Sequence, residues 1–393
     1  MQLKRLVCAG AVAIAAVGGA GSLAAPALAQ QTISGSGSTL LAPLINDDWL
    51  QAFNASQSSY DFSPYAAVGS GTGLSNLEAG TDAYAGSDLP LSGKANAYSS
   101  IVNGSLATGV VQLPWALTAT GVAYYLPRIG NGVKLSASVL ARIYEGKITK
   151  WNNRAIQSLN MTKKVTYKYT RKKVHGKWRR IRRRHVKLVD SPRLPNLTIT
   201  PVYRSDGSGD SYAFETFLSK GAGSAWGGGS PSSAWPISNV GIGVKGNSGI
   251  LNEVESVKGA IGYIAAPYLA AVVTDTGVAQ IENAAGNFEY PNGANIKSAA
   301  SSATSIPAQG PDFGLPIMYP PRRYKIAYPI STFTYGILPY GGTDAGNAAG
   351  LQAFATWVLG TGYGYGQSFG ANDLYVPLPA NVLAYDRAQL GAL

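Results

Sequence analysis

The sequence predicts an α/β fold, and three observations lead to this prediction. Segments with the apolar spacing of amphipathic helices alternate with short β-rich runs, as expected where helices pack on a sheet. Several of the β-rich runs end in turns of glycine, serine and threonine. Of the 393 residues, 46% are hydrophobic and 13% are charged, which is typical of a globular chain. Because ligands of α/β folds bind at the carboxyl ends of strands, these turns are the first candidate sites.

The N-terminus has the pattern of a cleavable secretory signal peptide over residues 1–29. Lys4 and Arg5 precede an apolar run of small residues, and Ala27-Leu28-Ala29 has the form of a cleavage site. The single cysteine, Cys8, lies before the apolar run has properly begun, whereas a lipoprotein cysteine follows it. We therefore expect an exported, soluble protein of the periplasm or the cell-wall side that is not a lipoprotein.

The first part of the chain after the signal peptide alternates strands and helices. Residues 33–39 have the pattern of a short strand that runs into a glycine-serine turn. We also expect strands at residues 66–68 and 83–87 and helices at residues 40–53 and about 74–77. Hydroxyl groups, glycines or a carboxylate follow each strand, in Ser38-Thr39, Gly69-Ser70-Gly71 and Ser87-Asp88. The strand ends of this part are thus polar and open to a ligand.

The next elements include two candidate crossings between halves of the molecule. Residues 109–126 form two β-rich runs separated by Pro114, and residues 327–335 form a second β-rich crossing. We also expect helices at residues 136–144, 151–159 and 345–359, strands at residues 194–203 and within 258–264, and a helix opened by residues 244–250. The tail from residue 374 is expected to pack on the surface.

The net charge of +12 comes from one segment. Thirteen of the 32 Lys and Arg residues lie in residues 163–187, which contain no Asp or Glu. Apolar or aromatic residues alternate with the basic ones, and His175-Gly176 suits a tight reversal, so we predict a β-hairpin with cationic faces, inserted at residues 161–192. Two interpretations stay open: a solvated surface insertion, or a site for a polyanion such as an anionic cell-envelope polymer. No nucleic-acid recognition module is visible, so we expect no dedicated nucleic-acid partner.

Residues 203–212 have the composition of an anion-binding turn that leads into a helix. Asp206 or Ser208 can cap the helix, and the glycines beside them let a ligand approach the backbone N–H groups. Arg204 adds a fixed positive charge. An ordinary capped turn has the same composition, so this stretch alone leaves both interpretations open.

Competing chemistries are poorly supported by the sequence. The turn at residues 69–73 lacks the third glycine of a dinucleotide fingerprint, and no P-loop motif occurs. A serine hydrolase that uses Ser70 or Ser208 lacks a partner, since the only histidines, His175 and His185, lie in the basic segment. With no cysteine after the signal peptide, a zinc site is improbable as well. We expect no catalytic residue, no metal and no cofactor.

The ordered set of turns resembles the phosphate-binding proteins of bacterial phosphate-specific ABC transporters. Ser38-Thr39-Leu40, Gly69-Ser70-Gly71, Ser87-Asp88 and residues 204–209 carry the resemblance, which covers nearly all of the chain except the basic segment. It implies a two-lobed periplasmic-binding-protein-like fold of type II with two hinge crossovers. Lobe 1 would comprise residues 30–112 and 329–393, and lobe 2 residues 113–328. It also implies a monomeric protein that binds inorganic phosphate and hands it to an ABC transporter permease.

The same resemblance implies a set of phosphate contacts: Thr39, Leu40, Ser70, Asp88, Arg204, Ser208, Gly209 and Asp210. Asp206 would hold the arginine in place. Asp88 can only accept a hydrogen bond, so it favours hydrogen phosphate over sulfate, which carries no proton near neutral pH.

Two of these positions depart from the family pattern. Leu40 stands where an aromatic residue is common, which matters little if its backbone N–H makes the contact. Asp210 stands where a threonine usually donates to phosphate. A carboxylate there would repel a dianion unless it takes a proton from the ligand or turns away to cap the helix.

The alternative function is that of a wall- or surface-associated polyanion-binding protein that works through the hairpin at residues 163–187. In that case the cleft would bind phosphate weakly.

Overall fold

A computed structural model describes most of the chain after the predicted signal peptide. It covers residues 32–57, 59–91, 109–175, 177–190, 193–271, 275–303, 317–340 and 345–392. The predicted signal peptide, Cys8 and Gly176 lie outside the described residues. Within the described ranges, no helix is both long and apolar enough to span a bilayer.

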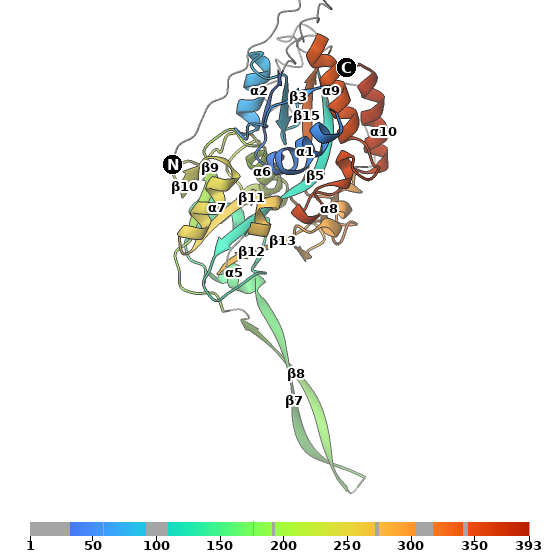
Figure 1. Cartoon of the computed structure of the whole chain (residues 1–393). Helices are drawn as coiled ribbons and strands as arrows, with labels where there is room; N and C mark the ends of the chain where they lie inside the picture. The colour runs from blue at the N-terminus through green and yellow to red at the C-terminus, as the bar shows by residue number, and fades with distance from the viewer. Residues whose placement is uncertain are drawn as a thin grey trace, which may run out of the picture. The chain divides into compact units, whose positions relative to one another are not determined.

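One mixed sheet of eight strands carries the architecture (Figure 1). Its strands are β2 (Gly35–Gly37), β4 (Tyr84–Ser87), β5 (Val110–Tyr125), β9 (Thr200–Arg204), β10 (Ile242–Val244), β11 (Ala260–Ala265), β12 (Thr276–Val278) and β15 (Ser331–Pro339). The strand order is β10-β9-β11-β5-β15-β4-β2, and β12 pairs with β5. The strands β2, β4, β9, β10 and β11 are short, and their ends lie close to helix starts.

The long strand β5 joins two groups of strands. Its residues 110–119 pair antiparallel with β15, and residues 120–125 pair with β11 and β12. The expectation of two separate runs around Pro114 is wrong, because the strand continues through the proline. The register of β15 shifts between Thr334 and Tyr335, opposite this proline. Such a bulge accommodates a residue that has no N–H group for the ladder.

Two smaller sheets flank the main one. β1 (Thr32–Ile33) pairs parallel with β3 (Asp61–Phe62), and β6 (Lys134–Leu135), β13 (Gln280–Glu282) and β14 (Phe288–Glu289) form a three-stranded sheet. The strand expected at residues 66–68 is not formed, since Ala66 makes only an isolated bridge with Ser36. The backbone there instead supports the turn that begins α2.

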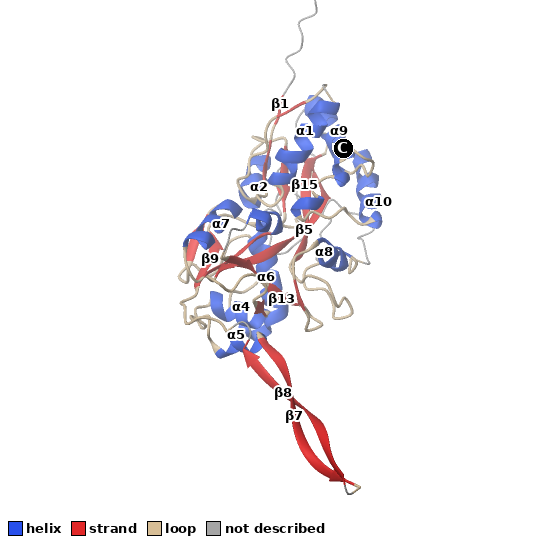
Figure 2. Cartoon of the chain, turned by 60° about the horizontal axis from the view of Figure 1, so that its bottom comes forward, coloured by secondary structure: helices blue, strands red, loops and turns tan. Residues whose placement is uncertain are grey.

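The helices are α1 (Leu50–Ser56), α2 (Ser70–Glu78), α4 (Ala137–Tyr144), α5 (Arg154–Leu159), α6 (Gly209–Ala222), α7 (Gly246–Ser256), α8 (Gly293–Ala300), α9 (Ala345–Val358) and α10 (Ala380–Gln389). A π-helical segment, Leu44–Trp49, leads into α1. In Figure 2, α1, α2, α9 and α10 lie around β15, whereas α4, α6 and α7 lie near β9. Side chains of Ser136 and Asn292 cap α4 and α8 by accepting backbone N–H bonds, a role in which serine and asparagine are favoured.

Aromatic side chains fill the core on both sides of β5. Trp115 and Trp49 pack edge to face with ring centroids 6.1 Å apart, and Phe214 stacks on Tyr263 at 4.7 Å. The tail after residue 374 is not a surface strap, because it contributes core side chains such as Tyr375, which is 3% exposed. Aromatic packing thus extends through both groups of strands that β5 joins.

The basic segment forms β7 (Met161–Val174) and β8 (Lys177–Asp190), which pair antiparallel from Met161↔Asp190 to Val174↔Lys177. No other strand of the described chain pairs with them (Figure 1). His175 adopts a left-handed backbone conformation with φ of 49° at the reversal. The hairpin follows α5 and returns to the body before β9.

Candidate functional site

Three strand ends and three helix starts meet in one buried polar cluster. Thr39 follows β2, Asp88 follows β4, Arg204 ends β9 and Ser208 caps α6. The structure brings together all of the residues that the sequence predicts for the site, and the side chains of Thr39, Ser70, Asp88, Arg204, Ser208 and Asp210 are at most 5% exposed. Burial on this scale requires that each polar group has a partner or receives a ligand.

Arg204 is the cation of the cluster. Its Nε and Nη2 atoms donate to the two oxygens of Asp206 at 2.7 and 2.5 Å, which fixes the plane of the guanidinium. Its Nη1 atom donates to Thr39 Oγ1 at 3.1 Å. The backbone N–H of Arg204 donates to the hydroxyl of Tyr263 at 2.9 Å. Asp206 thus holds the guanidinium through both of its carboxylate oxygens.

Asp88 is the acceptor of the cluster. The hydroxyl of Ser38 donates to its two oxygens at 2.8 and 2.6 Å, and Ser70 Oγ lies 3.4 Å from Oδ2. Burial, followed by the negative charge of Asp210, raises the pKa of Asp88 to about 7. A carboxyl group with this pKa changes its protonation state near neutral pH, where hydrogen phosphate also exchanges its proton.

The start of α6 packs directly against Asp88. Ser208, rather than Asp206, caps this helix, because its Oγ accepts from the N–H groups of Asp210 and Ser211 at 3.1 and 3.4 Å. At Gly209 a Cβ atom would lie 2.4 Å from the Cβ of Asp88. The glycine is therefore needed for the close approach of α6 to Asp88.

Asp210 turns its carboxylate toward polar donors from three other elements. Thr120 Oγ1 donates to its Oδ1 at 2.7 Å, and Asn247 Nδ2 donates to its Oδ2 at 2.8 Å. Arg204 Nη1 lies 3.3 Å from the same Oδ2. Burial raises the pKa of Asp210, although the Arg204 charge lowers it. Asp210, the residue that departs from the family pattern, is thus held by hydrogen bonds within the cluster.

Leu40 takes part through its backbone. Its N–H donates to Ser38 Oγ at 3.1 Å, and its carbonyl accepts from the hydroxyl of Tyr375 at 2.5 Å. Its side chain is fully buried in the core. Replacement of an aromatic residue by leucine at this position therefore changes packing rather than the polar contacts.

Sequence reasoning missed Thr120, Asn247 and Ser38 as members of the site. Asn247 Nδ2 donates to Thr39 Oγ1 at 2.9 Å as well as to Asp210, and its Oδ1 accepts from the N–H of Ala265. Its place in the turn that opens α7 was a usable signal. Thr120 lies in the middle of β5 and offers no local signal at all.

A cavity of about 390 Å³ adjoins the cluster. Its lining includes Thr39, Asp206 and Tyr268, together with the exposed Lys245. The hydroxyl of Tyr268 donates to the carbonyl of Thr39 at 3.2 Å. The cavity therefore lies beside two members of the cluster, Thr39 and Asp206.

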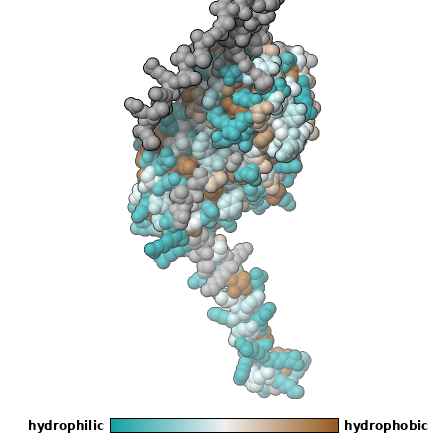
Figure 3. Space-filling model, viewed as in Figure 1, coloured by the Kyte–Doolittle hydropathy of each residue, from teal (hydrophilic) through white to brown (hydrophobic). Residues whose placement is uncertain are grey.

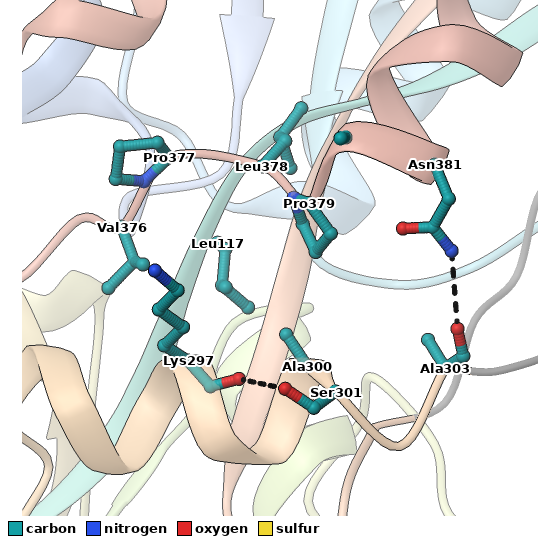
Figure 4. A pocket seen from close by; sticks show the side chains of 11 residues that line it. Leu117, Lys297, Ala300, Ser301, Ala303, Val376, Pro377, Leu378, Pro379 and Asn381 are labelled. Carbon is teal, nitrogen blue, oxygen red and sulfur yellow. Dashed lines mark hydrogen bonds between the residues drawn. The ribbon is translucent and has the colours of Figure 1, made fainter.

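A larger cavity of about 560 Å³ lies between α8 and the segment before α10 (Figure 4). Among the described residues that line it, Lys297 alone is charged, and Leu117, Val376 and Leu378 give it apolar walls. It lacks the converging donors of the buried cluster. The described residues also contain no group of three or more His, Cys, Asp or Glu side chains placed to hold a metal ion.

Comparison with known sequences identifies the family. The PBP superfamily domain matches residues 23–361. The phosphate-binding protein PstS of Xylella fastidiosa, strain Temecula1, is 30% identical over 367 residues, which cover 91% of this chain and 85% of the relative. The chain belongs to the phosphate-binding protein PstS family.

Other members of the PstS family are also similar to this chain. The phosphate-binding protein PstS of Pasteurella multocida is 28% identical over 91% of this chain and 90% of the relative. PstS 3 of Mycobacterium tuberculosis is 29% identical over 80% of this chain and 74% of the relative. These names describe binding proteins, in agreement with the expectation that the chain is not an enzyme.

Solved structures show the same mixed α/β, periplasmic-binding-protein-like fold. A high-affinity periplasmic phosphate-binding protein, PfluDING, solved with bound phosphate, matches with a TM-score of 0.67 at 22% identity, over 91% of this chain and 94% of that chain. The phosphate-binding protein of Stenotrophomonas maltophilia matches with a TM-score of 0.61 at 22% identity over the same shares of the two chains.

Proposed function

We propose that this chain binds inorganic phosphate, as hydrogen phosphate, in the buried cluster and delivers it to an ABC transporter permease. The observation that carries the proposal is the convergence of Arg204 with the starts of α2 and α6 around the acceptor Asp88. Membership of the PstS family and the names of its members support the same ligand.

The donors of the cluster suit a small tetrahedral anion. The start of a helix favours negative charge, and α6 presents the backbone of Ser208 and Gly209 beside Asp88. Arg204 and the hydroxyl of Thr39, 3.1 Å from each other, add further donors. An anion in this place would replace contacts among these groups with contacts to its own oxygens, which keeps every buried group bonded.

Asp88 would select the ligand. An ionised carboxylate accepts a hydrogen bond from the O–H group of hydrogen phosphate but repels sulfate, which has no O–H group to donate. We infer that phosphate is held by the predicted set: Thr39, Leu40, Ser70, Asp88, Arg204, Ser208, Gly209 and Asp210, with Asp206 as the support of the arginine.

The proposal also includes the arrangement of the whole protein. We take β5 and β15 as the two hinge crossovers between lobe 1, at residues 30–112 and 329–393, and lobe 2, at residues 113–328. The change of partners along β5 supports this assignment. Export by the signal peptide at residues 1–29, without a lipid anchor, would place the monomeric protein outside the cytoplasm.

Titration calorimetry of the mature protein with phosphate and with sulfate, at two pH values, tests the function. Arg204→Ala should weaken phosphate binding by about a hundredfold or more, since each hydrogen bond to a charged group contributes about 1.5–3 kcal/mol. Asp88→Asn should weaken phosphate binding and reduce the discrimination against sulfate. Arg323→Ala, at a guanidinium that stacks over Tyr324, is the matched control and should bind as the unaltered protein does. If phosphate produces neither heat nor thermal stabilisation, the proposal fails.

We further propose that the hairpin binds an anionic cell-envelope polymer that carries phosphodiester groups. One of its faces, the tyrosine-arginine face, includes Tyr167, Tyr169, Trp178, Arg180, Arg182 and Arg184, which the register of the two strands puts on the same side. Arg182 stacks over Tyr167 at 4.1 Å and Arg180 over Tyr169 at 3.9 Å. Stacking on the rings holds the guanidinium groups in place.

Two properties of this face favour a linear polymer. The arginines at 180, 182 and 184 follow one another at a spacing of about 6.6–7 Å along the strand. Trp178, at the distal end, is 69% exposed and offers a further contact surface. Hydrophilic residues dominate the hairpin in Figure 3, and its sequence holds no acidic residue between 163 and 187 to neutralise the charge.

Two matched double variants test the hairpin with soluble poly(glycerol phosphate) as the probe. Arg180→Gln with Arg182→Gln removes two charges from the tyrosine-arginine face, and Lys168→Gln with Lys172→Gln removes two from the opposite face. The first variant should lose about tenfold more affinity than the second, because it also loses the planar, stacked groups. Affinity should fall steeply with salt and vanish on deletion of residues 163–187, while phosphate binding persists. Equal losses in the two variants would refute the facial assignment, and absence of binding would refute the polymer partner.

A further inference from the structure

Three carboxylates surround the single guanidinium of the cluster. Asp206 and Asp210 both contact Arg204, and Asp88 lies close enough for the charges of Arg204 and Asp210 to act on it. With all three ionised, the cluster carries an excess of two negative charges before any ligand enters. Such a site repels hydrogen phosphate, so at least one carboxyl group must change its state when an anion binds.

The surroundings of Asp210 single it out. Asp206 is bonded through both oxygens to Arg204, which lowers its pKa. Asp88 is the acceptor for the ligand's own proton. Asp210 lies 3.3 Å from Nη1 of Arg204, the nitrogen that also bonds Thr39 and would turn to an entering anion.

The other groups that face Asp210 carry no positive charge. Thr120 from β5 and Asn247 from α7 are neutral donors, and the hydroxyl of Tyr268 is kept protonated because burial and the charge of Asp210 raise its pKa. Lys245 is exposed at the adjoining cavity and makes no ion pair among the described residues. Among the described residues, no other cation is therefore in place to neutralise Asp210 when Arg204 turns to the ligand.

We propose that Asp210 binds phosphate as a neutral carboxylic acid, so that capture of each phosphate takes up one proton from solvent at this residue. The inference rests on the proposed function. A protonated carboxyl has an O–H group and donates one hydrogen bond, as the threonine usual at this position does. Burial, which already raises the pKa of Asp210, makes the neutral form accessible.

Proton uptake makes the affinity of this chain depend on pH in a definite direction. Because the bound state holds one more proton than the unbound state, a lower pH favours binding. Relative to Asp210→Thr, the affinity of the unaltered protein should rise by up to about tenfold per pH unit as the pH falls toward the apparent pKa of Asp210. Below that pKa the residue is already protonated, and the difference should level off.

Calorimetry in pairs of buffers with different ionisation enthalpies counts the protons taken up per phosphate. At about pH 8 the unaltered protein should take up about one proton more than Asp210→Thr or Asp210→Asn, and the difference should vanish at a second pH, below the apparent pKa of Asp210. Titration of the phosphate itself cancels, since the ligand is the same in every experiment. Asp61→Asn, which removes an exposed carboxylate hydrogen-bonded to Thr32, should keep the proton count of the unaltered protein.

A second measurement does not need the variants. NMR of the unaltered protein labelled with ¹³C at the aspartate carboxyls should show one signal move to the position of a protonated acid when phosphate is added at about pH 8. Tight phosphate binding with equal proton counts, or without such a signal, would overturn this inference and leave the phosphate-binding function standing. Failure of the unaltered protein to bind phosphate at either pH would overturn both.

Discussion

At the scale of single residues, the buried carboxyl groups differ in what they contact. Asp206 has two charge-assisted bonds to Arg204, and Asp210 has three donors. Glu215 on α6 is fully buried, and among the described residues it has one hydrogen-bond donor. This donor is the N–H of Ser232, which donates to Oε2 at 3.1 Å. Its Oε1 atom has no hydrogen-bond partner among the described residues. A buried carboxyl with so few donors is stable only when it carries its proton.

We therefore predict that Glu215 makes stability depend on pH. Burial raises the pKa of Glu215 to about 9 from an ordinary value of 4.5. Between these values the unfolded chain loses the proton and the folded chain keeps it, so the free energy of unfolding falls as pH rises, by at most about 1.4 kcal/mol per unit. Glu215→Gln removes this slope. Urea denaturation should find the variant more stable than the unaltered protein at pH 8 and nearly equal at pH 4.5.

Glu253→Gln provides the control, because Glu253 lies on a partly exposed face of α7. It should leave the slope unchanged. The same slope in Glu215→Gln as in the unaltered protein would show that Glu215 is ionised in the folded state.

At the scale of elements, two helices, α6 and α8, begin with a glycine. Gly209 is the first residue of α6 and stands against Asp88, while Gly293 is the first residue of α8 and has only Val376, 3.9 Å from a Cβ built on it, as a neighbour. The two positions are alike in local structure and differ in their tertiary contacts. Substitutions at the two positions therefore separate the effect of helix propensity from the effect of crowding against Asp88.

We predict that Gly209→Ala destabilises the protein by about 1–3 kcal/mol and weakens phosphate binding, because the added methyl group forces α6 away from Asp88. Gly293→Ala should be neutral or stabilising, since alanine favours the helix by up to about 1 kcal/mol. Urea midpoints and phosphate titrations of both variants check this. Similar behaviour of the two variants would mean that α6 can shift without cost.

At the scale of the whole molecule, β5 ties the two groups of strands into one sheet, and the cluster draws residues from both. Thr39 and Asp88 follow strands on the β15 side, whereas Arg204 ends a strand on the β11 side. A ligand bonded to both groups stabilises the folded chain as a unit. Phosphate at about a hundred times its dissociation constant should add about 2.7 kcal/mol to the free energy of unfolding, which is why thermal stabilisation serves as a readout of binding.

The sequence alone determined the features that depend on residues close together in the chain. The glycine and hydroxyl turns, the helix that begins at residue 209 and the alternating basic segment follow from spacing and turn chemistry, which act over a few residues. The neighbouring residues in the chain did not show that β5 continues through Pro114. The bulge opposite the proline depends on β15, a strand more than 200 residues away in the sequence.

Only the tertiary structure decided the chemistry of Asp210. The sequence marked it as a departure from the family pattern, but its state depends on Thr120, Asn247 and Arg204, which reach it from other elements. Turn chemistry is set by neighbours in the chain, whereas the charge of a buried carboxyl is set by whatever folding brings within hydrogen-bonding distance. For that reason the anion-binding turns were predictable from the sequence, and the proton that accompanies the anion was not.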